Sequence, residues 1–441
     1  MKAVIGMGVT GLSVARYLVK KSDPFVLLDT REAPDNLDQF KREFPQVAIE
    51  LGPLNTETLL LAEEIIVSPG VALAEPALKE AVARGLSVIG DVDLFTRDAS
   101  APIVAITGSN AKSTVTALLG EMASKAGLVV SVGGNIGRPV LDLLDDEGVQ
   151  LYVLELSSFQ LETVQQLNAA AATVLNISAD HMDRYPALPA YVMAKQRIYF
   201  GAKSIVVNRE DVLTQPPLGA GIEMSSFGLD KPDRKGFGLL ECDGQEYLAY
   251  EFEPLMPVAD IKVPGRHNVA NALAAMALGQ AVDLPVDSML ETLKTFAGLP
   301  HRCQWVRKLD GVDYYNDSKG TNIGATQAAI SGLARKPAAL ILIAGGVGKG
   351  ADFTALKGEV EKNVETLILI GRDAPLIETA LSGSTNIYHA ASLNAAVEQA
   401  RGLARAGDAV LLSPACASFD MFAGFESRGD AFVEAVEALS C

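Results

Sequence analysis

The feature that most constrains the fold is an apolar segment that runs into a polar loop and then into a helical pattern, within residues 101–127. Residues 103–106 are apolar and predict a short buried strand. Residues 107–114 form the loop, and from residue 115 to residue 127 apolar residues recur at the spacing of an amphipathic helix. Strand, tight loop and helix N-terminus is the geometry in which backbone N–H groups converge on an anion.

The loop contains side chains suited to a nucleoside triphosphate, although its glycine pattern is unusual. Lys112 supplies a charge for phosphate oxygens, and the hydroxyl of Ser113 is a candidate magnesium ligand. The common pattern is G-x-x-x-x-G-K-[ST], and here Ile106 and Ala111 occupy its two glycine positions. From the loop alone, two interpretations stay open, a triphosphate-binding loop and an ordinary turn with a surface lysine.

The N-terminus carries a second phosphate-type pattern. A strand within residues 2–8 leads into Gly6-x-Gly8-x-x-Gly11 and a helix, and the next strand ends at Asp29. This arrangement meets the dinucleotide fingerprint, but it suits a nucleotide-sugar equally well. Asp29 is followed by Thr30 and Arg31, and the chain soon returns to the loop at residue 107, which favours a non-redox ligand.

Three polar residues follow or lie near predicted elements of the central region. Glu155 ends a buried strand, where nucleotide-hydrolysing enzymes place a magnesium ligand, although a structurally paired glutamate would fit as well. His181 follows the next strand, which is predicted at residues 172–177, and such a histidine is commonly structural. Lys195 lies in a predicted helix and by itself suggests a solvated surface lysine.

Residues 203–262 contain short strands and turns, which indicate a small β appendage.

The rest of the chain alternates strands and helices, which predicts a parallel sheet covered on both faces. We therefore predict an α/β protein of three domains. Residues 1–92 form an N-terminal Rossmann-like domain, residues 93–297 a central P-loop-type ATP-binding α/β domain with the β appendage, and residues 298–441 a C-terminal Rossmann-like domain.

Net charge, cysteine spacing and the distribution of apolar residues limit the kinds of partner that this chain is expected to bind. The net charge of −17 argues against nucleic acid and anionic membranes as partners. The four cysteines lie far apart, so neither a zinc site nor a disulfide framework is indicated. There is no uninterrupted apolar run long enough to cross a membrane. We expect a cytoplasmic protein that acts as a monomer on small molecules, without membrane insertion.

Several motifs, taken together and in order, resemble those of the ATP-dependent Mur ligases over essentially the whole chain. These motifs are residues 107–114, 155–161, 176–185, 267–271, 301–302 and 316–322. Residues 29–31, 68–70, 412–420 and 425–429 resemble the D-glutamate-adding members of this family. The family usually has glycine at Ala111, aspartate at Val347 and alanine at Gly320. At Ala111 a methyl group would crowd the phosphates if the backbone has a positive φ.

The resemblance implies ATP-dependent amide formation in peptidoglycan precursor synthesis, with D-glutamate added to UDP-N-acetylmuramoyl-L-alanine through an acyl phosphate. The implied cofactors are ATP, two Mg²⁺ ions and a CO₂-derived carbamate on Lys195. The implied catalytic residues are Lys112, Glu155, His181 and Lys195, and the implied metal ligands are Ser113, Glu155, His181 and Lys195. The implied ATP-binding residues are Gly108, Ser109, Asn110, Ala111, Lys112, Ser113, Thr114, Asn268, Asn271, Arg302 and Asp317. The implied binding residues for the UDP-sugar are Val9, Thr10, Thr30, Arg31, Gly70 and Asn135, and those for D-glutamate are Thr321, Lys349, Ser418, Phe419 and Phe425.

Three other functions remain to be distinguished. A nicotinamide oxidoreductase would use the N-terminal glycine motif, with Asp29 on the ribose. A nucleotide-binding regulator without catalysis is suggested by Ala111. A folylpolyglutamate synthase would share the ATP-binding core, but it offers no reason for an N-terminal UDP-binding domain.

Overall fold

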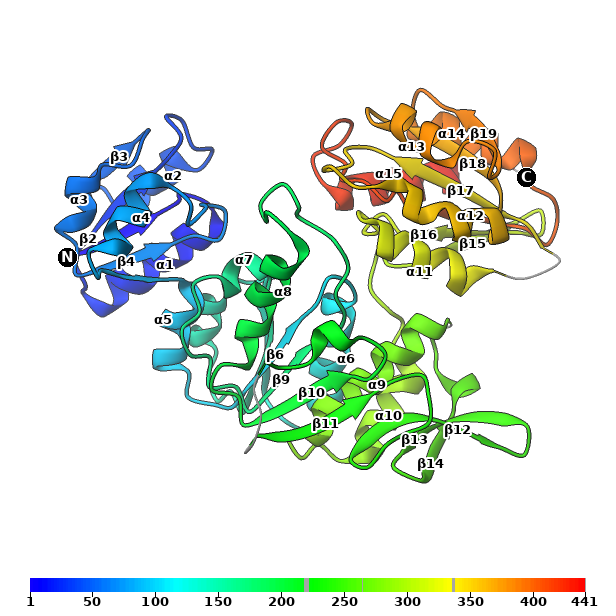
Figure 1. Ribbon diagram of the computed structural model, residues 1–441, viewed down its shortest axis with the longest axis horizontal. Helices are drawn as coiled ribbons and strands as arrows, with labels where there is room; N and C mark the ends of the chain where they lie inside the picture. The colour runs from blue at the N-terminus through cyan, green and yellow to red at the C-terminus, as the bar shows by residue number, and fades with distance from the viewer. Residues whose placement is uncertain (218–221, 264, 335–337, 441) are drawn as a thin grey trace. The chain divides into compact units, whose positions relative to one another are not determined.

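The computed structural model describes residues 1–217, 222–263, 265–334 and 338–440 (Figure 1). The chain forms two compact units. The first comprises residues 1–177, 189–260 and 270–295, and the second comprises residues 178–188, 261–269 and 296–441. Three sheets of five, nine and six strands organise them, and helices connect the parallel strands. The predicted three-domain α/β fold is confirmed, while the boundaries proposed at residues 92 and 297 stay predictions.

The N-terminal sheet is parallel, with the strand order β3-β2-β1-β4-β5. Its strands are β1 (Lys2–Ile5), β2 (Phe25–Asp29), β3 (Ile49–Leu51), β4 (Glu64–Val67) and β5 (Ser87–Ile89), and its helices are α1 (Val9–Lys21), α2 (Leu37–Glu43), α3 (Thr56–Leu60), α4 (Pro76–Ala83) and α5 (Asp91–Asp98). Successive residues of a strand point to opposite faces. Ala3 and Ile5 accordingly pack in the cluster that contains residues of α3 and α4, while Val4 packs with residues of α1 and α2.

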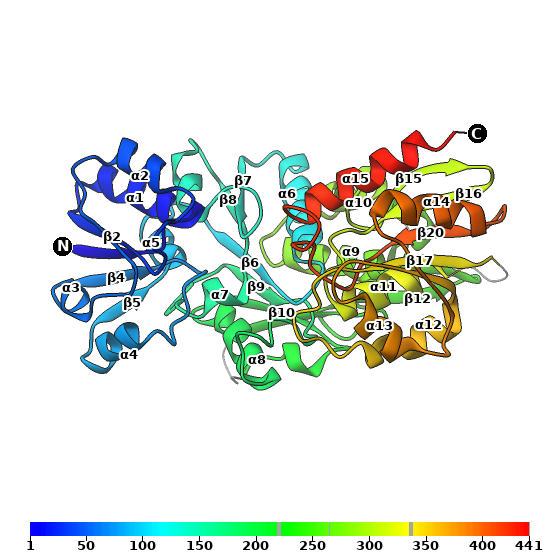
Figure 2. The same cartoon turned by 90° about the horizontal axis from the view of Figure 1, so that it is seen from above.

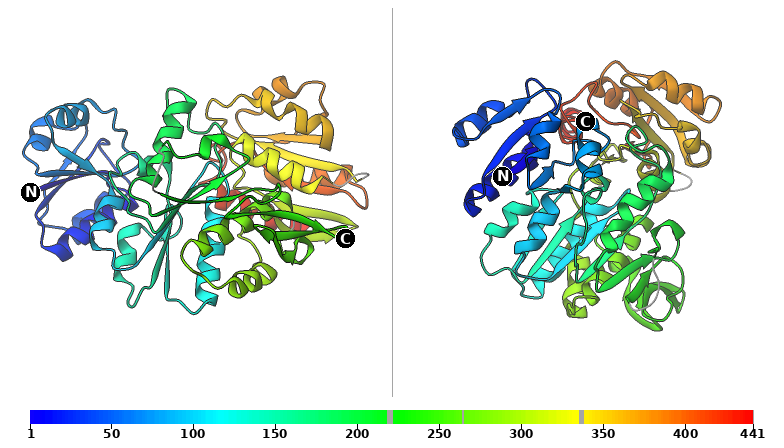
Figure 3. Two further views of the ribbon diagram at one scale, coloured as in Figure 1. Left: turned by 60° about the horizontal axis from the view of Figure 1, so that its bottom comes forward. Right: turned by 60° about the vertical axis from the view of Figure 1, so that its left-hand side comes forward.

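The central sheet has the order β14-β13-β12-β11-β10-β9-β6-β8-β7. Its strands are β6 (Ile103–Thr107), β7 (Val130–Gly134), β8 (Leu151–Glu155), β9 (Ala171–Val174), β10 (Ser204–Asn208), β11 (Glu223–Phe227), β12 (Gly236–Cys242), β13 (Gln245–Tyr250) and β14 (Glu253–Pro257). The strands from β7 to β12 are parallel, and β13 and β14 extend one edge by antiparallel pairing (Figure 3). Because β6 lies between β8 and β9, the loops after these three strands meet at one edge of the sheet.

Five α-helices and four short 3₁₀ segments belong to the same stretch of described chain. The α-helices are α6 (Lys112–Lys125), α7 (Ser158–Leu161), α8 (Leu188–Gln196), α9 (Arg266–Gln280) and α10 (Val286–Thr295), and the 3₁₀ segments are η1 (Val140–Asp145), η2 (Arg197–Tyr199), η3 (Val212–Thr214) and η4 (Val258–Asp260). Two ends differ from the sequence prediction. Helix α6 begins at Lys112 rather than at residue 115, and β9 ends at Val174 rather than at residue 177.

The C-terminal sheet has the order β15-β16-β20-β17-β18-β19, with only β15 antiparallel to its neighbour. Its strands are β15 (Gln304–Leu309), β16 (Val312–Asn316), β17 (Leu340–Gly345), β18 (Val364–Ile370), β19 (Asn386–His389) and β20 (Ala409–Leu412). Its helical segments are α11 (Ile323–Leu333), η5 (Phe353–Leu356), α12 (Lys357–Asn363), α13 (Ala374–Leu381), α14 (Leu393–Leu403) and α15 (Phe425–Ala438). Residues of α11, α12 and α13 pack on one face and residues of α14 and α15 on the other (Figure 2). Within the described residues no helix is both long enough and apolar enough to span a membrane.

Candidate active site

The loop after β6 has a left-handed residue at the start of α6. Ala111 has φ 68° and ψ −8° and is the N-cap of the helix. This positive φ is the condition under which the methyl group of Ala111 is expected to crowd the phosphates. Lys112 is the first residue of the helix, and its Nζ donates to the carbonyl oxygens of Gly108 and Ser109 at 2.9 and 3.0 Å. The ammonium group therefore lies over the loop.

Asn176 holds this loop from the neighbouring strand, a role that the sequence analysis did not assign. Its Oδ1 accepts from the backbone N–H of Asn110 at 2.8 Å, and its Nδ2 donates to the carbonyl of the same residue at 3.2 Å. The backbone N–H of Ser109 donates to the carbonyl of Asn176 at 2.9 Å. A polar residue just beyond the end of β9 was the available signal, because β9 is hydrogen-bonded to β6.

Lys195 is buried against the same loop. Its side chain belongs to a residue that is only 1% exposed, so the interpretation as a solvated surface lysine is wrong. Its Nζ donates to the carbonyl of Gly108 at 2.8 Å and lies 4.7 Å from the centre of the Tyr191 ring. The hydroxyl of Tyr191 in turn lies 3.1 Å from Oγ of Ser109. The amine is thus enclosed between helix α8 and the loop after β6.

Glu155 provides a buried carboxylate beside this loop. Its Oε1 accepts from Nδ2 of Asn135 at 2.7 Å. Its Oε2 is also buried and has no hydrogen-bond partner among the described residues. Ser113, at the N-terminal end of α6, is 4% exposed. An unpaired carboxylate oxygen and a buried hydroxyl are both suited to a hard divalent cation, because Mg²⁺ takes oxygen ligands.

The cation would depend on ligands other than a carboxylate cluster. The described part of the chain contains no group of three or more His, Cys, Asp or Glu side chains placed to hold a metal. Mg²⁺ is commonly held by one or two carboxylates together with phosphate oxygens and water. Glu155 and Ser113 therefore fit a magnesium ion that arrives with a nucleotide.

A cavity of about 600 Å³ in the first unit is lined by all the residues predicted to bind the UDP-sugar. These residues are Val9, Thr10, Thr30, Arg31, Gly70 and Asn135. Both carboxylate oxygens of Asp29 are occupied, since they accept from the backbone N–H of Met7 and from the guanidinium of Arg31. Burial alone would raise the pKa of Asp29, but these hydrogen bonds outweigh it and lower the pKa. Asp29 thus positions Arg31, which disfavours the role on a ribose that a nicotinamide enzyme requires.

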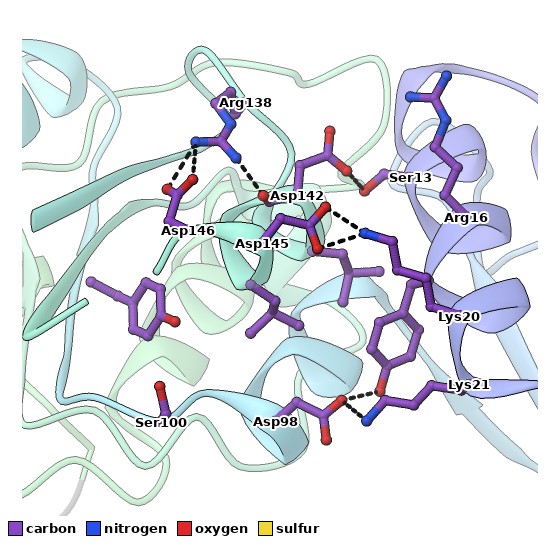
Figure 4. A pocket seen from close by; sticks show the side chains of 14 residues that line it. Ser13, Arg16, Lys20, Lys21, Asp98, Ser100, Arg138, Asp142, Asp145 and Asp146 are labelled. Atoms are coloured by element: carbon purple, nitrogen blue, oxygen red, sulfur yellow. Dashed lines mark hydrogen bonds and ion pairs between the residues drawn. The ribbon is translucent and has the colours of Figure 1, made fainter. Parts of the chain in front are cut away.

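A second cavity, of about 620 Å³, lies between α1 and the segments α5 and η1 (Figure 4). Four of its charged side chains form two ion pairs, Lys20 with Asp145 and Lys21 with Asp98. Ser13 of α1 also donates to Asp142 of η1. Val9 at the start of helix α1 and Pro139, just before η1, both line the UDP-sugar cavity. These pairs therefore connect two segments that line that cavity.

In the second unit, Asp317 is buried at the end of β16. Its carboxylate accepts from Oγ of Ser413 at 2.7 Å and from the backbone N–H of Cys303 at 3.1 Å. Burial raises the pKa of Asp317 to about 7, against the effect of these hydrogen bonds. At Gly320 a Cβ atom would lie 2.5 Å from Asp317 Oδ2, so the small residue found here in place of the usual alanine has a steric reason.

Buried Arg428, which lies in the motif at residues 425–429 but had no predicted role, joins two loops that carry predicted ligands. Its guanidinium donates to Oγ and the carbonyl of Ser318 at 3.0 and 2.7 Å and to the carbonyl of Cys416 at 3.1 Å. Burial lowers the pKa of Arg428 to about 10. All three acceptors lie more than ten residues away in sequence, which is why the local motif did not indicate these contacts.

The predicted D-glutamate residues come from neighbouring segments of this unit. Val347 and Ala417 form an antiparallel bridge, with N···O distances of 2.8 and 2.9 Å, which places the segment of Lys349 beside that of Ser418. The side chain at Val347 is not needed for this backbone contact. Ser418 is buried, Phe419 is 75% exposed, and the centre of the Phe425 ring lies 3.7 Å from Nζ of Lys319.

The predicted residues are divided between the two units. Lys112, Ser113, Glu155 and Lys195 belong to the first unit, together with the UDP-sugar cavity. His181 belongs to the second unit, as do the following predicted nucleotide and D-glutamate residues: Asn268, Arg302, Asp317, Thr321, Lys349, Ser418, Phe419 and Phe425. Asn271 belongs to the first unit and lies three residues after Asn268 on helix α9, on the same helix face.

The sequence of this chain matches the descriptions of known protein families in three regions. The family descriptions "Mur ligase MurD-like, N-terminal domain", "Mur ligase middle domain" and "Mur ligase, glutamate ligase domain" match residues 1–90, 106–279 and 301–416. The chain belongs to the Mur ligase family, whose members are ATP-dependent ligases. The match of the N-terminal domain also answers the folylpolyglutamate alternative, which gave no reason for such a domain.

Curated relatives are similar over the full length. The chain is 57% identical over 440 residues to UDP-N-acetylmuramoylalanine--D-glutamate ligase of Pseudomonas savastanoi pv. phaseolicola, covering 100% of this chain and 98% of the relative. It is 56% identical to the protein of the same name from Pseudomonas aeruginosa and 52% identical to that from Acinetobacter baylyi, with the same coverage.

Solved structures share the fold. A pseudomurein peptide ligase type C from Methanothermus fervidus aligns with a TM-score of 0.63 at 20% identity, covering 100% of both chains. The MurF ligase from Thermotoga maritima in complex with ADP aligns with a TM-score of 0.63 at 16% identity, covering 95% of this chain and 96% of that one. At these identities the similarity concerns architecture alone.

Proposed function

We propose that this Mur ligase joins D-glutamate to UDP-N-acetylmuramoyl-L-alanine at the expense of ATP, as a cytoplasmic, monomeric enzyme of peptidoglycan precursor synthesis. The observation that carries the proposal is the full-length identity of 52–57% to curated ligases of that name. The cavity lined by the six predicted UDP-sugar residues supports the choice of a nucleotide-sugar as the carrier substrate.

The reaction needs an activated carboxyl group, because a carboxylate does not react with an amine at neutral pH. The L-alanyl carboxylate attacks the γ-phosphorus of ATP, giving an acyl phosphate and ADP. The amine of D-glutamate then attacks the acyl carbon, and the tetrahedral intermediate expels inorganic phosphate as the amide forms. Charge accumulates on the transferred phosphoryl group, so catalysis consists mainly of positioning and of stabilising that charge.

The loop after β6 supplies much of this stabilisation. Lys112 at the start of α6 provides a cation for the β- and γ-phosphates, and the helix N-terminus adds its partial positive charge. Asn176 keeps the loop in shape through its bonds to Asn110. Asn268, Asn271, Arg302 and Asp317 are the remaining residues proposed for ATP.

Magnesium, when bound, would neutralise phosphate charge and orient the attacking carboxylate. Glu155 and Ser113 would hold one ion, and His181 and a carbamylated Lys195 would hold a second. An unmodified ammonium cannot ligate a cation, whereas a carbamate offers anionic oxygens. Lys195 suits this modification because it is buried, and its carbamate nitrogen would keep an N–H for the carbonyl of Gly108.

The amino acid would be bound by Thr321, Lys349, Ser418, Phe419 and Phe425 of the second unit. Lys349 would pair with a carboxylate of the substrate, and the Val347–Ala417 bridge keeps this lysine beside Ser418. The stereochemistry of the substrate is the point on which the proposal is most specific.

Phosphate release from ATP tests this proposal. With UDP-N-acetylmuramoyl-L-alanine present, D-glutamate should give turnover at least ~10²-fold above L-glutamate, L-alanine or diaminopimelate, because a site built for one set of polar groups rejects ligands that leave those groups unpaired. Comparable turnover with diaminopimelate would reassign the amino-acid substrate. Failure of all four amino acids to elicit ADP would favour the catalytically silent regulator suggested by Ala111.

A further inference from the structure

Asp180 contacts a residue proposed to bind D-glutamate, and nothing so far assigns it a function. It lies in the segment 178–188, which belongs to the second unit. Its Oδ1 lies 3.1 Å from Nζ of Lys349, and its Oδ2 accepts from Nδ2 of Asn322 at 3.2 Å. The side chain is 11% exposed. The carboxylate is therefore partly enclosed and bound to two residues of the C-terminal domain.

Local backbone structure fixes the positions of both residues that bind Asp180, which are Asn322 and Lys349. Asn322 is the N-cap of α11, and its Oδ1 accepts from the N–H of Ala325 at 2.9 Å. Lys349 follows the glycine turn after β17, where a Cβ at Gly346 would lie 2.2 Å from the carbonyl of Ala417. The lysine itself has φ 52°. Asp180 thus meets an ammonium group and an amide that the C-terminal domain presents in fixed positions.

In this ion pair, the ammonium group of Lys349 binds a carboxylate of the protein itself. An amino-acid substrate that uses the same ammonium group brings a carboxylate of its own. Two carboxylates sharing one lysine repel each other, so the binding of one weakens the binding of the other. The next residue along the segment is His181, whose backbone N–H also donates to Asp180 Oδ1 at 2.9 Å. The other oxygen of Asp180, Oδ2, keeps its contacts with Asn322 and with Nε2 of His181 at 3.6 Å, so the segment stays attached when Oδ1 leaves Lys349.

We propose that Asp180 occupies the D-glutamate carboxylate position on Lys349 and is displaced from it when the amino acid binds. The inference rests on the proposed function, since it takes Lys349 as a D-glutamate ligand. Asp180 competes with the substrate in this account. A residue that merely oriented Lys349 for the substrate would instead assist binding, so the two roles predict opposite signs.

Steady-state kinetics of the full-length enzyme distinguish the competing role of Asp180 from the orienting role. Asp180→Asn keeps the size of the side chain and removes the competing charge, and the KM for D-glutamate should fall about fivefold, the scale of a partly exposed ion pair. The KM values for ATP and UDP-N-acetylmuramoyl-L-alanine should change by less than about twofold, because neither ligand uses Lys349. Asp183→Asn is the matched control, since it removes an exposed aspartate from the same segment and should leave all three KM values as they are.

Two further variants make the outcome decisive. Asp180→Ser removes the charge by a different side chain and should also lower the KM for D-glutamate, which guards against a folding defect in one variant. Adding Asp180→Asn to Lys349→Ala should give no decrease, because the competed lysine is gone. An unchanged or raised KM for D-glutamate in both folded Asp180 variants overturns the inference.

If Lys349 does not bind D-glutamate, as the proposed function requires, the kinetic result differs from the one that overturns the role of Asp180. Lys349→Ala alone should raise the KM for D-glutamate, and no rise would remove Lys349 from the amino-acid site. A rise in Lys349→Ala without a fall in the Asp180 variants would overturn the role of Asp180 alone.

Discussion

Nζ of Lys195 lies 2.8 Å from the carbonyl oxygen of Gly108, the same oxygen that accepts from Nζ of Lys112 at 2.9 Å. One lysine comes from helix α8 and the other from helix α6, and they meet at the loop after β6. Two ammonium groups on one carbonyl oxygen repel each other. Converting one of them to an anionic carbamate would turn that repulsion into attraction, which is a physical reason to expect the two lysines to differ in chemical state.

Lys195→Ala should therefore be nearly inactive, and acetate should restore part of the activity by placing a carboxylate where the carbamate stood. Lys195→Arg should stay inactive with acetate, because its cation still fills the position. Phosphate release at increasing acetate concentration measures the effect. Acetate should not rescue Lys112→Ala, which serves as the control for a general salt effect. Full activity of Lys195→Ala without additive would show that no carbamate is needed.

Replacing Ala111 by glycine should be tolerated in both stability and activity. A left-handed alanine costs about 1 kcal/mol, while glycine loses a further ~0.5–1 kcal/mol of chain entropy on folding, so the two effects nearly cancel. Thermal unfolding should show no decrease in Tm for Ala111→Gly, and turnover should stay within roughly tenfold, the range expected when the loop retains Lys112.

Ala117→Gly, in the interior of the same helix, provides the comparison for Ala111→Gly. That position lacks the left-handed conformation, so glycine should cost about 1 kcal/mol there. Equal destabilisation by both substitutions would mean that Ala111 is not strained.

The buried carboxyl of Asp317 should make stability depend on pH. Because folding raises its pKa from 3.8 to about 7, the native state keeps a proton that the unfolded chain loses, and stability falls as the pH rises across that interval. Asp317→Asn removes this loss. Chemical unfolding from about pH 4.5 to about pH 7.5 should show the variant gaining on the order of 2 kcal/mol over the wild type across the series.

The exposed turn residue Asp310 supplies the control for that series. Asp310→Asn should follow the wild-type curve in parallel. A constant difference between Asp317→Asn and the wild type at every pH would contradict the raised pKa of Asp317.

Much of the fold was predictable because the spacing of apolar residues along the sequence indicates where strands and helices form. The strand–loop–helix unit at residues 103–125 and the alternation of strands and helices near both ends emerged with small errors at their boundaries. The error at the end of β9 mattered most, because it hid Asn176 in a predicted strand when its side chain in fact binds the loop after β6.

Residues that act through distant partners were less accessible to sequence reasoning. Lys195 resembled a surface lysine because a helix pattern does not show what packs against the helix, and its contact with Gly108 spans 87 residues. Asp180 and Lys349 are separated by 169 residues, so the motif at residues 176–185 that contains Asp180 did not indicate this pairing. Both pairs became visible only when the loops at the strand ends were placed in space.

The central claim is that ATP activates the L-alanyl carboxylate of the UDP-sugar for amide formation with D-glutamate. Labelling both oxygens of that carboxylate with ¹⁸O tests it most directly, because an acyl phosphate passes one of them to phosphate. We predict that ³¹P NMR will show one ¹⁸O in the inorganic phosphate of each turnover when D-glutamate is the amine. Unlabelled phosphate would contradict this reaction, because the heavy oxygen that the carboxylate loses on forming the amide would then have left as water.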